Sequence, residues 1–428
     1  MEELLQLREE NGRLRKAVDE LSILNDLARV IGSTMSLDEV IENVVKRSVR
    51  AVKGEQGMIT LVDEVAPMEM KTLIRALDST GDHKQFHLNQ NVLGWMMINK
   101  KPLISNDMAT DSRFSGIKVD GNLRSLLCVP LLVKNRLVGI LAVFNKKENT
   151  EFSEDDKRLL SILAAQSGQI LENARLYSEE QKKMAMEKEL IAAREVQTNL
   201  LPKHVPQTPN FQFAAHTIPA QEIGGDFYDF IKLGENRYEV VVADVAGKGL
   251  SAALLATLGK GVLYAHALQN PSPKAHLKQS NMILRGSIPR KSFITMLLAV
   301  VDSDSSSVTV SNAGQCYPIF YRKSNNSTEV LTVKGMPLNF TDDILCEECV
   351  IKMEPDDCMV IYSDGVSEAQ NSMREFFGDD RVKALVAQHA QGPAEIMLQK
   401  IVDDVKLYSK GIPQSDDITV LVVKATGS

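Results

Sequence analysis

The longest helical pattern in this chain runs from Asp155 to Leu201, and Pro202 ends it. The stretch contains no proline, and Gly168 is its only glycine, so little inside it would break a helix. At 1.5 Å per residue, about 45 helical residues reach about 70 Å, which is far longer than one domain needs. The pattern therefore predicts a multidomain chain with a helical linker at residues 176–203.

Two heptad rows on this helix differ in polarity. The apolar row is Leu163, Ile170, Tyr177, Met184 and Ile191. The intervening polar row is Gln166, Asn173, Glu180 and Glu187. A coiled coil built on these rows would be weak, and weak pairing suits a helix that changes its partner or register. A solvated spacer helix is the alternative interpretation.

Residues 1–24 predict a second coiled-coil helix. From Leu4 to Ala28, apolar residues and asparagines recur by three and four, with Glu and Arg at flanking positions. Asparagine at an a-type position, such as Asn11, is a known device for fixing the register of a coiled coil. We expect a homodimer contact through this helix and the linker helix, and a single amphipathic helix packed on its own domain is the alternative.

Composition limits the partners of the chain. Its 428 residues suffice for two or three domains, and a net charge of −7 argues against nucleic acid as the main partner. No apolar run approaches the roughly 20 residues of a membrane helix, and no signal peptide opens the chain, so we expect no membrane contact. Five scattered cysteines suit reduced thiols and a cytoplasmic location. The lone pair Cys346 and Cys349 lacks a second zinc-ligand pair, so coincidence on a strand is the better interpretation.

Residues 25–175 mix helical and strand patterns and resemble a GAF domain. A helical period follows Leu37, and strands are predicted at 57–62, 125–133 and 137–144, the last two joined by a turn at Lys134. The segments that carry the resemblance are Gly94, Pro102–Asp107, Asp111–Phe114, Ser125–Pro130 and Gly139–Asn145. The resemblance implies a sheet flanked by helices and a possible pocket for a small-molecule ligand. A dimerisation module without a ligand is the alternative.

Some GAF domains bind cyclic nucleotides and carry an Asn-Lys, Phe and Asp-Glu signature. Asn145-Lys146, Phe152 and Asp156 match that signature, but Lys157 replaces its glutamate. Lys146 and Asp156 could equally form a structural ion pair, which is the favoured interpretation. The missing glutamate at Lys157 weakens the interpretation of the protein as a GAF-based cyclic-nucleotide receptor.

The stretch from Val240 to Leu250 predicts a buried strand that ends on Asp244 and leads through glycines into a helix. A carboxylate at the end of a buried strand is costly unless a cation compensates for it. Taken alone, Asp244 is equally interpretable as a cap of the following helix and as a ligand of a cation.

Acidic residues recur at strand ends and tight turns of the C-terminal part. They are found in Gly224–Asp229, Asp244–Gly249, Val360–Gly365 and Ser415–Val423. With few competing His or Cys ligands, these carboxylates predict a site for hard cations such as Mg²⁺ or Mn²⁺.

These segments closely resemble the SpoIIE-type branch of the PPM (PP2C-like) Ser/Thr phosphatases. The ordered motifs are Ala192–Pro202, Pro219-Ala, Gly224–Asp229, Asp244–Gly249, Ala252–Leu255, Phe293–Met296, Asn312–Gly314, Gly335–Leu338, Tyr362–Gly365 and Asp416–Val420. The resemblance implies a PPM-type αββα sandwich at residues 204–428. The predicted fold class is thus α/β and α+β multidomain: a GAF domain, a long helical linker and this sandwich.

The resemblance also implies which residues act. Asp226, Asp244, Asp364 and Asp416 would hold two Mn²⁺ or Mg²⁺ ions, and the backbone carbonyl of Val245 would be a further ligand. Two such ions would lower the pKa of a bridging water and clamp the phosphoryl oxygens of the substrate.

Four neighbouring residues have other interpretations. Asp417 should point away along its strand, and Asp229 is a weaker, water-mediated or structural candidate. Lys248 is interpretable as a phosphate contact or a surface lysine, and Gln315 replaces a histidine of many relatives. No general acid is assigned.

The resemblance implies a metal-dependent protein Ser/Thr phosphatase regulated by its GAF domain. Such relatives often act on phosphorylated anti-sigma factor antagonists, so the expected partner is a phosphoprotein of that kind. We further hypothesise that movement of the linker completes the metal site. The alternative is a catalytically inactive GAF and coiled-coil scaffold or ligand-binding signalling module. Retention of all four acidic positions favours the enzyme.

Overall fold

The computed structural model describes residues 36–62, 71–76, 90–108, 110–111, 113, 123–269 and 272–427. The predicted N-terminal coiled coil at 1–24 lies outside the described residues. The chain divides into two compact units at Ala185 and Met186, within the long helix α4 (Glu154–Leu200). The predicted long helix is confirmed, and its bounds agree with the sequence pattern to within a few residues.

The N-terminal unit is built on one antiparallel sheet with the strand order β2-β1-β5-β4-β3. Its strands are β1 (Gly54–Leu61), β2 (Lys71–Ala76), β3 (Leu103–Ser105), β4 (Leu126–Val133) and β5 (Arg136–Lys146). The predicted hairpin turn between β4 and β5 is confirmed, because Lys134 and Asn135 both have positive φ angles there. Two such residues in succession suit the tight turns that match the twist of paired strands.

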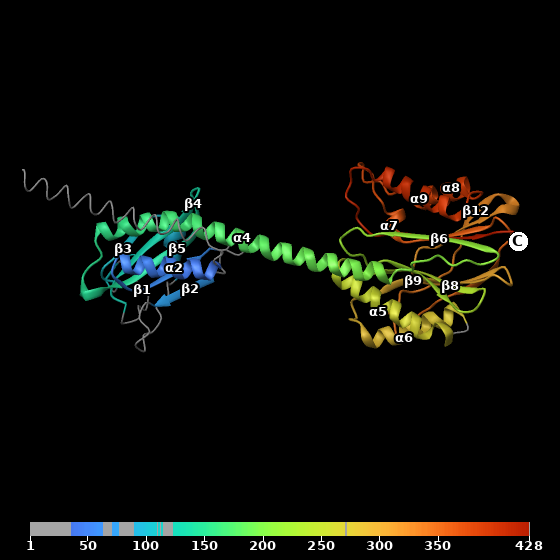
Figure 1. Ribbon diagram of the computed structural model, residues 1–428, viewed down its shortest axis with the longest axis horizontal. Helices are drawn as coiled ribbons and strands as arrows, with labels where there is room; N and C mark the ends of the chain where they lie inside the picture. Colours follow the sequence, from blue (N-terminus) through green and yellow to red (C-terminus); the bar gives the residue numbers. More distant parts are fainter. Residues whose placement is uncertain are drawn as a thin grey trace, which may run out of the picture. The chain divides into compact units, whose positions relative to one another are not determined.

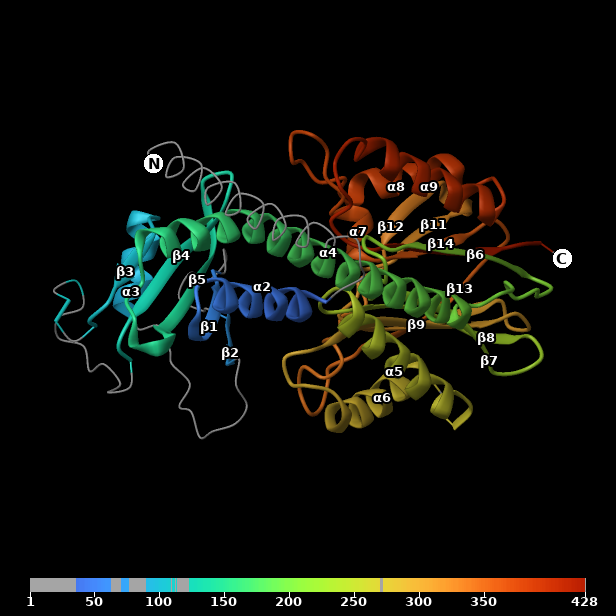
Figure 2. The same ribbon diagram turned by 60° about the vertical axis from the view of Figure 1, so that its left-hand side comes forward.

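Helices α2 (Leu37–Ala51) and α4 pack on one face of this sheet, as Figure 2 shows. Apolar residues such as Val45 of α2 and Leu163 of α4 share one core with the sheet. Gly168 lets α4 approach the sheet closely, because a Cβ there would lie 3.2 Å from the carbonyl oxygen of Leu132. Helix α3 (Gln90–Asn99) belongs to a separate core that includes Met58, and the 3-10 turn η2 (Lys147–Asn149) leads toward α4.

The C-terminal unit contains two five-stranded antiparallel sheets among the described residues, with the orders β13-β10-β9-β8-β7 and β12-β11-β14-β15-β6. The first sheet comprises β7 (Phe227–Lys232), β8 (Arg237–Val245), β9 (Ile294–Asp302), β10 (Ser307–Ala313) and β13 (Glu348–Lys352). The second comprises β6 (Phe211–Ile218), β11 (Ile319–Arg322), β12 (Ser327–Val330), β14 (Cys358–Tyr362) and β15 (Ile418–Ala425).

Helices cover the outer face of each sheet, which gives an αββα sandwich (Figure 1). Helices α5 (Leu250–His266) and α6 (Pro273–Ser287) pack on the first sheet. Helices α8 (Asp379–His389) and α9 (Ala394–Tyr408) pack on the second, near the short α7 (Asp364–Ser367). The inner faces form a core of their own between the sheets. Strands such as Val240–Ala243 are therefore buried on both faces, which explains their uninterrupted apolar sequence.

Within the described ranges, no helix is both long and apolar enough to cross a membrane. The five cysteines are all free thiols, and Cys346 and Cys349 are not joined to each other.

Candidate metal centre

The four predicted carboxylates lie at strand ends of both sheets in the C-terminal unit. Asp226 immediately precedes β7, and Asp244 is the penultimate residue of the neighbouring strand β8. Asp364 follows β14 at the start of α7, and Asp416 shortly precedes the neighbouring strand β15. Antiparallel pairing brings the start of one strand beside the end of its neighbour, so each sheet contributes one pair of carboxylates.

Hydrogen bonds join the two pairs across the sandwich. Thr419 Oγ1 of β15 donates to Asp226 Oδ2 at 2.6 Å, and Ser363 Oγ accepts from the backbone N–H of Thr419 at 3.0 Å. Ser363 and Thr419 both lie within the sequence motifs of the family resemblance, but the sequence alone did not indicate a role for either hydroxyl group. Their contribution is to connect the ends of β14 and β15 to the Asp226 carboxylate.

Asp417 holds the loop that carries Asp226. Its carboxylate accepts backbone N–H groups of Ala220 at 2.7 Å, Gly225 at 2.7 Å and Asp226 at 3.1 Å. A Cβ on Gly224 would lie 2.5 Å from Asp417 Oδ2, which explains the need for glycine there. The role of Asp417 is therefore to position this loop.

Two further glycines allow backbone segments to approach each other around the carboxylates. A Cβ on Gly225 would lie 3.0 Å from the Val245 carbonyl oxygen, the predicted backbone ligand. A Cβ on Gly365 would lie 2.0 Å from the carbonyl oxygen of Asp417. The second contact brings the Asp364 turn against the segment that carries Asp416.

The carboxylates influence one another's ionisation. Burial first, and then the charge of Asp244, raises the pKa of Asp226 well above its ordinary value. Burial, followed by the charges of Asp364 and Asp416, raises the pKa of Asp244 to about 7. Burial and the charge of Asp416 also raise the pKa of Asp364. These mutual effects show that the four groups form one electrostatic cluster, in which a cation would relieve repulsion.

Asp244 is not a helix cap. Helix α5 has Gly249 as its N-cap residue, without a side-chain capping hydrogen bond. Of the two interpretations that the sequence left open, the structure excludes the cap.

The residues present fit a hard divalent cation in their chemistry. All four side chains offer carboxylate oxygens, which Mg²⁺ and Mn²⁺ prefer. Asp364 Oδ1 is buried and, within the described part of the chain, has no hydrogen-bond partner, as an oxygen kept for a ligand would be. In the described residues, however, no three His, Cys, Asp or Glu side chains converge into a preformed metal site. Asp416 Oδ2 is instead paired with Lys248 Nζ at 3.0 Å.

Asp229, the weaker candidate, is engaged in contacts with a neighbouring helix. Its carboxylate pairs with Lys260 Nζ at 2.7 Å and accepts a hydrogen bond from Tyr264 Oη at 3.1 Å. Both partners lie on α5, so Asp229 fastens that helix to β7.

Gln315 lies beside the cluster. Thr295 Oγ1 donates a hydrogen bond to Gln315 Oε1 at 3.3 Å. Thr295 is also the residue of β9 that lies opposite Asp244 of β8. The side-chain nitrogen of Gln315 is buried without a hydrogen-bond partner among the described residues.

The end of α4 contacts the Asp226 loop within the C-terminal unit. Gln197 Nε2 donates to the Gly224 carbonyl oxygen at 2.7 Å, and the Gly224 N–H donates to Gln197 Oε1 at 3.3 Å. Arg194 pairs with Glu222 of the same loop at 3.3 Å. The sequence motif at 192–202 pointed to this region without indicating which side chain makes the contact.

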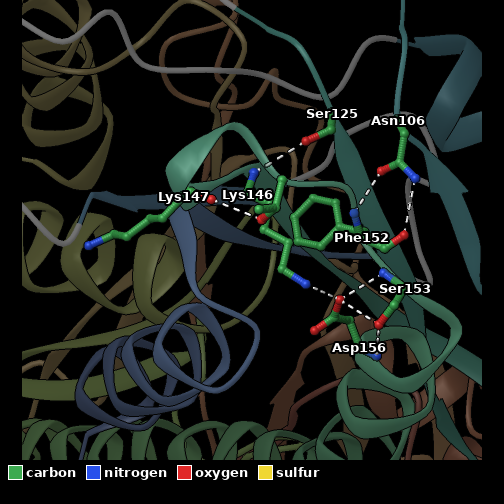
Figure 3. Close-up of polar contacts among 8 residues, drawn as sticks. Asn106, Ser125, Lys146, Lys147, Phe152, Ser153 and Asp156 are labelled. Atoms are coloured by element: carbon green, nitrogen blue, oxygen red, sulfur yellow. Dashed lines mark hydrogen bonds and ion pairs between the residues drawn. The ribbon is translucent and has the colours of Figure 1, made fainter.

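In the N-terminal unit, the residues of the cyclic-nucleotide signature support the start of α4 (Figure 3). Lys146 pairs with Asp156, and the backbone N–H of Ser153 donates to Asp156 Oδ2 at 2.7 Å. The backbone of Phe152 exchanges two hydrogen bonds with the Asn106 side chain, at 2.8 and 3.0 Å. The structural ion pair expected for Lys146 and Asp156 is confirmed.

Comparison with known proteins agrees with this geometry. Residues 234–426 match the family described as Stage II sporulation protein E (SpoIIE), and residues 34–172 match the GAF domain family. The chain combines a GAF domain with a SpoIIE-type domain, and the multidomain fold predicted from the sequence is confirmed.

Curated relatives are similar over about half of the chain. Phosphoserine phosphatase RsbU of Bacillus subtilis is 29% identical over 236 residues, which are 55% of this chain and 70% of RsbU. Phosphoserine phosphatase RsbP of the same organism is 22% identical over 248 residues, covering 57% of this chain and 59% of RsbP. The solved SiaA-PP2C domain of Pseudomonas aeruginosa covers 57% of this chain and 98% of its own, with a TM-score of 0.51 and 20% identity. That likeness concerns the fold of the SpoIIE-type domain.

Proposed function

We propose that this protein removes phosphate from phosphoserine or phosphothreonine of a partner protein in bacterial signalling, under control of its GAF domain. The observation that carries the proposal is the cluster of Asp226, Asp244, Asp364 and Asp416, which the two sheets contribute in pairs. The SpoIIE-type domain and the phosphoserine phosphatases RsbU and RsbP among its relatives support it. The five free thiols suit the reducing cytoplasm as the place of the reaction.

The four carboxylates and the Val245 carbonyl would hold two Mn²⁺ or Mg²⁺ ions. Bound there, the ions would supply an activated water and clamp the phosphoryl oxygens. The protein's own residues hold the carboxylate oxygens of the site in place. Thr419 fixes the Asp226 carboxylate, and Asp417 fixes the loop on which Asp226 lies.

The proposed substrate is a phosphorylated anti-sigma factor antagonist or a protein of that kind. This assignment rests on the family resemblance and on the phosphoserine phosphatases among the relatives. A catalytically inactive scaffold is the competing function, and the retention of all four carboxylates argues against it.

We also propose a homodimer formed through the linker helix. Along the heptad row, Leu163 is buried, whereas Tyr177, Met184 and Ile191 are exposed by 58, 44 and 51%. Exposed apolar side chains at heptad spacing are what a second helix would cover. A GAF ligand remains part of the proposal as the signal that this helix transmits.

The decisive experiment compares Mn²⁺-dependent phosphate release from a phosphoserine protein by the wild type and by Asp244→Ala. We expect a loss of activity of about 100-fold or more, since a metal ligand supports several kcal/mol of transition-state stabilisation. Asp343→Ala is the matched control, because Asp343 is an exposed carboxylate that, within the described part of the chain, pairs only with Lys278 on the surface. Equal activity of the wild type and Asp244→Ala would refute the metal assignment, and a wild type without any release would favour the scaffold.

A further inference from the structure

Lys248 is held in its position by an unusual loop backbone. The flanking residues Gly247 and Gly249 have φ angles of 111° and 71°. Residues with a side chain rarely adopt such angles, so this conformation of the loop between β8 and α5 depends on glycine at both positions. The Lys248 side chain is thus directed by the backbone of the loop that follows Asp244.

Lys248 makes two contacts with one segment. Its Nζ lies 3.0 Å from Asp416 Oδ2, and it donates a hydrogen bond to the carbonyl oxygen of Ser415. The other carboxylate oxygen of Asp416 accepts the backbone N–H of Asp417 at 2.9 Å. Both oxygens of Asp416 are therefore engaged by the protein itself.

Of the four carboxylates, Asp416 alone forms an ion pair within the described part of the chain, and its partner is Lys248. Asp226 accepts a hydrogen bond from Thr419, which carries no charge, and Asp364 Oδ1 has no hydrogen-bond partner there. The ammonium of Lys248 thus neutralises part of the negative charge of the cluster. It also occupies Asp416 Oδ2, an oxygen that the proposed metal site would need.

We propose that Lys248 is an internal counter-cation, which competes with the divalent metal ion for Asp416. An ammonium group and a divalent cation repel each other when both lie beside one carboxylate oxygen. Metal binding at Asp416 is therefore opposed by Lys248, and the lysine lowers the metal affinity of the site. The inference rests on the proposed metal-dependent function and gives a role to a residue for which the sequence left two alternatives.

The size of the effect follows from the exposure of the pair. The side chains of Lys248 and Asp416 are 47 and 39% exposed, so their pairing is of the weak, partly solvated kind. Removal of such a pair changes an equilibrium by about 1.5- to 5-fold. Lys248→Gln should tighten Mn²⁺ binding by that factor.

The test measures the Mn²⁺ dissociation constant of the full chain by titration calorimetry, without substrate. Wild type is compared with Lys248→Gln and with Lys383→Gln, which removes the same charge from a surface pair with Asp380. The comparison is repeated in an Asp416→Asn background, where Lys248→Gln should have no effect. Lys248→Arg keeps the charge and should behave like the wild type. Circular dichroism melting confirms that each variant is folded.

The outcomes separate the inference from the function. Tighter binding by Lys248→Gln but not by Lys383→Gln supports the counter-cation. Unchanged or weaker Mn²⁺ binding by Lys248→Gln, with normal binding by the wild type, overturns it and leaves the metal-dependent function intact. An increase in the KM for phosphoprotein with unchanged Mn²⁺ affinity also overturns it and assigns Lys248 to substrate phosphate. A folded wild type that binds no Mn²⁺ refutes the proposed function itself.

Discussion

The side-chain amide of Gln197 forms a pair of hydrogen bonds with the backbone of Gly224, one in each direction. Gln197 belongs to the last turns of α4, and Gly224 lies two residues before the proposed metal ligand Asp226. The contact fastens the end of the long helix to the loop that Asp417 also holds. It gives the hypothesis of regulation through the linker a specific atomic basis.

We predict that Gln197→Ala lowers Mn²⁺-dependent phosphate release by about 5- to 10-fold, because losing partners for two backbone groups costs about 1–1.5 kcal/mol. Asn199→Ala is the control on the same helix turn, since among the described residues the Asn199 side chain bonds only to the carbonyl oxygen of Glu195. Activities are compared at several Mn²⁺ concentrations. If both variants behave alike, the contact with Gly224 has no special role.

Regulation by the N-terminal unit can be tested by truncation. If the linker transmits a signal, a chain of residues 204–428, which lacks Gln197, should differ in activity from the full chain. Deletion of the GAF domain alone should also change the activity. A truncated chain as active as the full chain, with no response to GAF deletion, would exclude this mode of control.

Gly365→Ala should destabilise the SpoIIE-type domain by about 1–3 kcal/mol, because its Cβ would lie 2.0 Å from the backbone oxygen of Asp417. Gly261→Ala is the opposite case. Gly261 lies within α5, and a Cβ there would meet nothing within 4 Å. That change should stabilise the domain by about 0.5–1 kcal/mol. Urea unfolding of both variants measures the difference, and a harmless Gly365→Ala would contradict the close approach.

The double variant Met184→Glu, Ile191→Glu should weaken or abolish the proposed dimer. Both residues are exposed apolar members of the heptad row on α4, and two charges there oppose helix pairing. Glu187→Gln is a control on the polar row. Analytical ultracentrifugation reports the oligomeric state, and a wild type that sediments as a monomer at all concentrations would rule out the homodimer.

The stability of the N-terminal unit should depend on the ionisation of Glu172. Hydrogen bonds from Arg175 lower the pKa of this carboxyl group, burial opposes that effect, and the charges of Arg175 and Arg136 lower the pKa further. Because the pKa is lower in the folded state, the ionised group stabilises the fold above its ordinary pKa. That contribution is lost as the pH falls through the folded-state value. Glu172→Gln should therefore destabilise more at pH 7 than at about pH 3, as measured by thermal unfolding. A difference independent of pH would argue against the ionised form as the stabilising species.

Local patterns in the sequence were sufficient for several elements and for the acidic segments, whereas the choice of the four ligands among the acidic residues came from the family resemblance. The proline-free stretch that became α4, the hairpin turn at Lys134 and the apolar strand before Asp244 depend on short-range preferences, which a sequence displays directly. The acidic residues could be selected because carboxylates at the ends of buried strands need a compensating partner.

The partners of those residues were decided only by the tertiary structure. Thr419 reaches Asp226 across 193 positions of sequence, and Lys248 reaches Asp416 from a loop on the other sheet. Such contacts depend on how two sheets pack and on the φ angles of glycines, and no local pattern encodes them. The sequence by itself determined that Asp244 lies near the end of a buried strand. The tertiary structure excluded the helix cap and placed Asp244 in a cluster with Asp226, Asp364 and Asp416, because only the packed sandwich brings the ends of four strands together.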